Sequence, residues 1–253
     1  MKNRWLTYSK AHTDPELAYL YAINVIRGPW PKGEDAISKS VFYSQLYARN
    51  IIKGPWPKCE DLMSKNPYTA YGYAKEIIKG RWPKGEDAIS KDTNCSILYA
   101  KEVIKVRWSE AEKLILKNIT ASDAYENIMS VCIYANDIIK GRWPEAEEVV
   151  LKKAYPAFMY AKEVIKGRWL QAEDIVAAND FISCLYAQHV IKGKWGRCEK
   201  IIKNPNSERA PACCLYYAKY VIKGPWPEAE KIIKKDQKSW KQYCEELKDK
   251  NGK

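Results

Sequence analysis

Residues 160–173 read YAKEVIKGRWLQAE, and the same order of residue types recurs eight times along the 253-residue chain. Most of the tryptophans that mark the repeats are 26 residues apart, and the wider gaps after Trp108 and Trp195 contain insertions of nine and five residues. A fixed period of this size is the signature of a repeat architecture. Numbered from the N-terminus, repeats 1 to 8 are centred on Trp30, Trp56, Trp82, Trp108, Trp143, Trp169, Trp195 and Trp226.

Each repeat has the residue order of a helix, a turn and a second helix. With the tryptophan as position 0, Tyr and Ala occupy positions −9 and −8, aliphatic residues −5 and −4, and Lys or Arg −3. Gly at −2, present in seven repeats, is expected to be the left-handed stop of the first helix. Pro at +1 opens the second helix, and Glu at +4 lies near its positive end.

Neither short helix can bury its apolar stripe alone, so the hairpins must stack on their neighbours. The sequence therefore predicts an all-α fold, an α-solenoid of eight 26-residue helix-turn-helix repeats plus capping helices. A single helical-repeat domain is expected over residues 1–253. Tyr243 and Leu247 fall where the next −9 and −5 would be, which predicts a C-terminal cap over 237–250. At the other end, Arg4-Trp5 resembles a remnant of a preceding turn.

Composition restricts the class of protein and of partner. The net charge of +12 favours acidic partners. No apolar stretch is long enough for a membrane span, and the N-terminus lacks the apolar core of a signal peptide, so a cytoplasmic location is expected. The eight cysteines fill small or apolar slots of the repeat and are expected to be reduced core thiols. Two scattered histidines do not make a zinc pattern, and neither a metal nor a cofactor is expected.

Two features shared by all repeats have both a structural and a functional interpretation. The tyrosines and tryptophans form either a stacking platform for nucleic-acid bases or the core of each hairpin, and their identical phase favours the core. The cations at −3 form either a track for phosphates or helix-end pairs with the Glu at +4, and the pairing is favoured.

Position −1 varies along the chain. Repeats 1, 2 and 8 have Pro there, whereas the middle repeats have a cation. A contiguous basic stripe on the turn edge is what an anion-binding surface requires, and ordinary solvated variation is weighed equally against it. This stripe is the candidate binding site for a partner or an anion: Arg81, Arg107, Arg142, Arg168 and Lys194.

The two insertions, within 117–130 and 203–212, are expected to form loops. Insertions in a solenoid often supply the recognition surface, although drift explains them equally well.

The general plan is similar to that of tetratricopeptide and Sel1-type hairpins, but the unit is shorter and lacks their signatures. Over about residues 15 to 250 the chain more closely resembles the YAxxVIKGRWPxAE repeat of uncharacterised proteins of tailed phages and large viruses. This resemblance implies a helical array and a viral source, with the host cytoplasm as its location. It implies no activity and no functional residues.

No nucleophile motif, phosphate loop or metal cluster is present, so an enzyme is not expected. The sequence favours a non-catalytic binding or scaffold protein that recognises a protein partner. For the viral source that the resemblance implies, the expected use is to inhibit or sequester a host protein. The alternative is a binder of nucleic acid or nucleotide-like anions through the central basic stripe. Sequence alone leaves the oligomeric state open.

Overall fold

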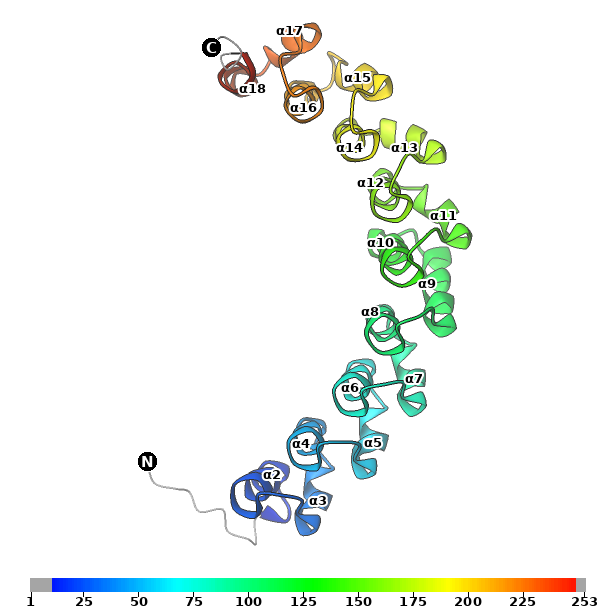
Figure 1. Cartoon of the computed structure of the whole chain (residues 1–253), viewed down its shortest axis with the longest axis vertical. Helices are drawn as coiled ribbons and strands as arrows, with labels where there is room; N and C mark the ends of the chain where they lie inside the picture. The colour runs from blue at the N-terminus through cyan, green and yellow to red at the C-terminus, as the bar shows by residue number, and fades with distance from the viewer. Residues whose placement is uncertain (1–10, 249–253) are drawn as a thin grey trace. The chain divides into compact units, whose positions relative to one another are not determined.

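The computed structural model describes residues 11–248, and every regular element in that range is a helix. Consecutive helices pair as hairpins, which confirms the predicted all-α solenoid of helix-turn-helix repeats (Figure 1). The helices group into two compact units, Met1–Lys117 (unit 1) and Asn118–Lys253 (unit 2). The expectation of one domain over 1–253 stays a prediction.

The first helix of every repeat is an α-helix that continues directly into a π-helical turn. These helices are α2 (Pro15–Tyr21) with η1 (Ala22–Ile26), α4 (Val41–Tyr47) with η2 (Ala48–Ile52), α6 (Pro67–Tyr73) with η3 (Ala74–Ile78), α8 (Thr93–Leu98) with η4 (Tyr99–Ile104), α10 (Tyr125–Tyr134) with η5 (Ala135–Ile139), α12 (Ala154–Met159) with η6 (Tyr160–Ile165), α14 (Asp180–Tyr186) with η8 (Ala187–Ile191), and α16 (Ala210–Tyr217) with η9 (Ala218–Ile222).

The second helices begin directly after the tryptophans and, except for α9, are shorter. They are α3 (Pro31–Ile37), α5 (Pro57–Met63), α7 (Pro83–Ile89), α9 (Ser109–Ala121), α11 (Pro144–Val150), the 3-10 turn η7 (Leu170–Ala172) with α13 (Glu173–Ala177), α15 (Gly196–Ile202), and the 3-10 turn η10 (Pro227–Ala229) with α17 (Glu230–Ile233). Within unit 1, the first helices α2, α4, α6 and α8 form one layer and the second helices α3, α5 and α7 the other (Figure 1).

Short polar residues set the helix starts. In several repeats, an Asp, Asn or Ser that ends the preceding loop accepts a hydrogen bond from the backbone N–H two or three residues later, as N-caps do. These caps are Asp14, Ser40, Asn66, Asp92, Asn179 and Asp236. Pro at +1 is the first residue of the second helix in five repeats, as predicted, because its missing N–H has no helical partner at that position.

The expected left-handed glycine at −2 is wrong. No glycine among residues 11–248 has a positive φ; the left-handed residue is instead the Lys or Arg at −3, with φ between 57° and 63° in all eight repeats. The carbonyl of the buried Ala at −8 explains the geometry, because it accepts the N–H of position −3 and, in seven repeats, also that of Gly at −2. In repeat 3, for example, Lys79 and Gly80 both donate to Ala74.

The first insertion differs from the expected loop. It lengthens a second helix, because α9 continues to Ala121 and leaves only a short connection before α10. The second insertion, around 203–209, is a turn-rich loop as expected.

The core consists of the residues that all repeats share. The tryptophans are 1–6% exposed, and each lies with its ring centroid 4.7–5.3 Å from that of the tyrosine at −9 of the same repeat. Seven of the eight cysteines are buried, and all eight are unpaired. Burial raises the pKa of Cys59 to about 11 and that of Cys132 to about 12, which keeps these thiols protonated at neutral pH.

A ninth first helix follows repeat 8, as predicted for the cap. It consists of α18 (Gln237–Tyr243) and η11 (Cys244–Lys248). Tyr243 is fully buried, and its hydroxyl accepts a hydrogen bond from the Trp226 N–H at 2.5 Å. Residues 249–250 of the predicted cap, and the Arg4-Trp5 remnant, lie outside the described residues.

Candidate functional site

In most repeats the hydroxyl of the tyrosine at −9 forms a hydrogen bond with the turn of the preceding repeat. Tyr160 is fully buried; its hydroxyl accepts the N–H of Trp143 at 2.6 Å and donates to Glu147 Oε1 at 3.0 Å. The Trp N–H to Tyr bond, 2.5–2.8 Å long, recurs in the pairs Trp30–Tyr47, Trp56–Tyr73, Trp82–Tyr99, Trp169–Tyr186, Trp195–Tyr217 and Trp226–Tyr243.

The burial of these rings confirms that the repeated aromatic residues are core, not an exposed stacking platform for nucleic-acid bases. Burial also raises the pKa of Tyr47 to about 12 and that of Tyr99 to about 12. Both phenols therefore remain protonated at neutral pH and keep the proton that they donate to the glutamate of the preceding repeat.

Four of the five cations predicted to form the central stripe are engaged within their own hairpin. Each arginine at −1 makes a two-pronged ion pair with the Glu at +4, for example Arg142 with Glu147, and this contact holds the pKa of Glu147 below its usual range. Arg81, Arg107 and Arg168 pair in the same way with Glu86, Glu112 and Glu173. Lys194 is exposed and makes no ion pair within residues 11–248. The stripe's role in binding stays a prediction.

The alternation of Arg and Pro at −1 has a structural reason that the sequence did not reveal. In repeats 1 and 2, which have Pro there, a lysine of the following repeat approaches the glutamate instead: Lys58 lies 3.9 Å from Glu34, and Lys84 lies 3.6 Å from Glu60. A largely buried carboxylate needs a nearby cation, and repeats 1 to 6 supply it from one of two positions.

Replacing Arg168 by Ser is therefore expected to destabilise the protein. Glu173 is 3% exposed and would lose the cation that it pairs with. We expect the free energy of unfolding to fall by about 1–2 kcal/mol, which is less than for a fully buried ion pair because the arginine is exposed. The matched change Lys194→Ser should stay within about 0.5 kcal/mol. Urea unfolding followed by circular dichroism measures both, and equal effects would contradict a scaffold role for the arginine.

The cations at −3 do not pair with the Glu at +4, so that expectation is wrong. All eight are exposed, and none makes a side-chain hydrogen bond or ion pair with another residue in the range 11–248. We call these residues the edge row. In unit 1 it comprises Arg27, Lys53, Lys79 and Lys105, and in unit 2 Lys140, Lys166, Lys192 and Lys223.

The backbone of the edge row is strained. A left-handed conformation costs an L-residue with a side chain roughly 1–2 kcal/mol, yet no repeat uses glycine at this position. Strained residues that recur in every repeat are a reason to look for a function, because glycine would adopt this conformation without the strain.

Replacing Lys79 by Gly tests this strain. We expect a change between zero and about 1 kcal/mol of added stability, since the relief of strain exceeds or balances the flexibility that glycine adds to the unfolded chain. The same replacement at Lys75, within the π-helical turn of the same repeat, should cost about 1 kcal/mol. The midpoint of thermal unfolding should therefore stay the same or rise for Lys79→Gly and fall for Lys75→Gly. A destabilised Lys79→Gly protein would show that the side chain supports the fold.

Two other rows of charge in unit 1 are paired between neighbouring repeats. At −7 and −6, Arg49 pairs with Glu76 at 3.1 Å, and Lys75 pairs with Glu102 at 2.5 Å. On the second helices, Lys58 pairs with Asp35 at 2.6 Å, and Lys84 pairs with Asp61 at 2.8 Å. The edge row thus contributes eight exposed, unpaired charges to a protein whose net charge is +12.

Exposed aromatic side chains lie at the opposite end of the first helices. At position −14, Phe42 and Tyr68 are each 61% exposed in unit 1, and Phe181 is 42% exposed in unit 2. Eleven helical residues separate positions −14 and −3, which at a rise of about 1.5 Å per residue is roughly 16 Å. The exposed surface of unit 1 thus has an aromatic end and a cationic end.

Comparison with protein-family models, with curated proteins and with solved structures finds no match. Across residues 11–248, no group of three or more His, Cys, Asp or Glu side chains is placed to hold a metal ion. Over the same range, no helix has the length and apolar character required to cross a membrane.

Proposed function

We propose that this chain is a non-catalytic binding scaffold that recognises an acidic protein partner through the edge row. The observation that carries the proposal is the set of eight exposed cations, each held in a strained backbone conformation and none neutralised by another described residue. A row of unpaired charges attracts an oppositely charged surface and directs its approach.

The exposed aromatic residues favour a protein over a nucleic acid. Single-stranded nucleic acid places a base next to each phosphate, so its binding sites interleave cations with exposed rings. In unit 1 the exposed rings at −14 lie roughly 16 Å along the helix from the cations at −3. A protein surface with an acidic and an apolar part matches this separation. Sequestration of such a partner in the cytoplasm is the use that the resemblance to viral repeat proteins favours.

The test removes charge without removing the fold. Glycine fits the left-handed backbone, so changing all four edge-row residues of unit 1 to Gly should leave the protein folded. We expect affinity for labelled polyglutamate, measured by fluorescence anisotropy, to fall at least tenfold, since four exposed pairs contribute together more than about 1.4 kcal/mol.

The control removes the same charge from the other edge of the same unit, by changing the lysines at +9 to Gln. These are Lys39, Lys65, Lys91 and Lys117. The control should retain most of the affinity. If both variants lose it equally, binding depends on net charge alone and the edge row is not the site.

A further inference from the structure

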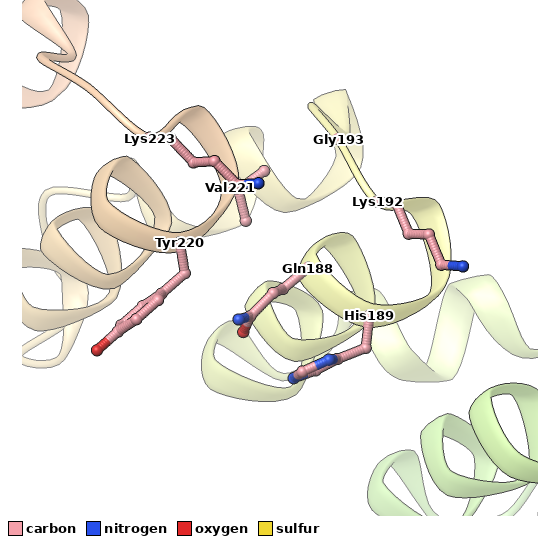
Figure 2. Close-up of a pocket in the computed structure, with 7 residues that line it drawn as sticks. All are labelled: Gln188, His189, Lys192, Gly193, Tyr220, Val221 and Lys223. Atoms are coloured by element: carbon pink, nitrogen blue, oxygen red, sulfur yellow. The ribbon is translucent and has the colours of Figure 1, made fainter.

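In unit 2, two edge-row lysines lie at one pocket between neighbouring first helices. The pocket has a volume of about 360 Å³, and its lining comes from the ends of η8 and η9. Figure 2 shows the seven residues, with His189 and Tyr220 extending to the same side: Gln188, His189, Lys192, Gly193, Tyr220, Val221 and Lys223. A volume of this size lies within the range of about 300–1,000 Å³ that small-molecule sites occupy.

The lining contains no carboxylate, although most repeats before it have one at the equivalent position. Repeats 3 to 6 have an acid at −6, and in repeat 4 this acid, Glu102, pairs with Lys75 of the preceding repeat. Repeats 7 and 8 have His189 and Tyr220 instead. The acidic side chain that repeats 3 to 6 have at −6 is thus absent from the lining of this pocket, whereas the edge-row lysines Lys192 and Lys223 are present.

The other lining groups are donors or ring surfaces. Gln188 accepts a hydrogen bond from the Tyr216 hydroxyl through its side-chain oxygen, which leaves its amide N–H groups to donate. Burial, and to a lesser extent Lys162, lowers the pKa of His189, so its ring is a neutral hydrogen-bonding group at pH 7. Tyr220 is 40% exposed, and its ring lies against that of Tyr216, with the centroids 4.6 Å apart and the planes tilted by 48°.

We propose that this pocket binds a small phosphorylated ligand, with Lys192 and Lys223 contacting the phosphate and Gln188 donating to it. Figure 2 shows Lys192 extended away from the other lining groups, but the side chain is exposed and unpaired, so its flexible stem is free to turn inward. His189 and Tyr220 offer ring surfaces for the rest of a ligand such as a nucleotide. The site is distinct from the surface of unit 1 on which the polyglutamate test acts.

Isothermal titration calorimetry with pyrophosphate tests the proposal on the full chain. The wild-type protein should show saturable binding with one site. Two variants, His189→Glu and Tyr220→Glu, each restore the acid that repeats 3 to 6 have at this position, so both should fold. Each adds a negative charge to the lining of the pocket that contains the two lysines and should weaken binding at least tenfold.

A variant with Lys79→Gly and Lys105→Gly removes two edge-row charges far along the sequence from this pocket, and should bind pyrophosphate as the wild type does. Adenosine monophosphate distinguishes a nucleotide from a free phosphate as the ligand. Tighter binding of adenosine monophosphate than of inorganic phosphate would show that the rings contact the ligand, and equal binding would show that the pocket contacts the phosphate alone. Both results agree with the proposed site. Absence of saturable binding to the wild type, or unchanged affinity in both Glu variants with native circular dichroism, would overturn it. The polyglutamate result is unaffected by either outcome.

Discussion

Removal of residues 67–92, one complete 26-residue repeat of unit 1, is expected to leave a folded and shorter protein. The deletion joins Asn66 directly to Thr93, so Asn66 takes the N-cap position that Asp92 holds for α8. Tyr99 then occupies the place of Tyr73 and accepts the N–H of Trp56. Every contact at the new junction has an equivalent in the intact protein, because hairpins in a solenoid contact only their neighbours.

Removal of residues 67–79 alone should have a much larger effect. This deletion removes the first helix of repeat 3 but keeps its second helix, α7, whose apolar side then has no first helix to pack against. It also removes Tyr73, which accepts the N–H of Trp56. Circular dichroism should show helicity per residue preserved after the 26-residue deletion, and cooperative thermal unfolding of unit 1 lost after the 13-residue deletion. Equal loss of helicity in the two deletion variants would contradict the repeat model.

Replacing Tyr160 by Phe is expected to lower the free energy of unfolding by about 2–3 kcal/mol. The change keeps the ring but removes the hydroxyl, which leaves the N–H of Trp143 buried without a partner and removes a donor from the 8% exposed Glu147. An unsatisfied buried donor costs about 1–3 kcal/mol by itself.

Tyr125→Phe is the matched control in the same unit, since Tyr125 is 48% exposed and its hydroxyl has no such buried partners. Its effect should stay within about 0.5 kcal/mol. Urea unfolding monitored by circular dichroism compares the two. Equal midpoints would show that the hydroxyl at −9 does not join one repeat to the next.

The hairpin plan was predictable because its signals are local. Pro at +1 and Glu at +4 act within a few residues of the tryptophan that marks each repeat, and the structure places helix boundaries beside these tryptophans. The buried aromatic residues followed from their identical phase in every repeat.

Contacts between repeats were not predictable from local rules. The bond from Tyr160 to Glu147 joins residues 13 apart, and nothing in the pattern of one repeat specifies it. One signal was present: the cap keeps Tyr243 although no tryptophan follows it, which indicates that the tyrosine serves the preceding repeat.

The left-handed residue was misassigned because glycine ordinarily takes positive φ values. In this chain the shared carbonyl of the alanine at −8 places that conformation one residue earlier, on a lysine or arginine. The eight residues with this conformation are exposed, whereas the arginines at −1 pair with largely buried glutamates.

The central claim is that the edge row and the aromatic residues at −14 together recognise an acidic protein. Its most direct test compares the dissociation constants of the wild-type protein for a peptide rich in Glu and Phe and for an oligothymidylate of equal charge, at about 0.15 M salt. We expect the peptide to bind at least tenfold more tightly, because it supplies apolar side chains for Phe42 and Tyr68 as well as charge for the cations. Equal or tighter binding of the oligothymidylate would contradict the account.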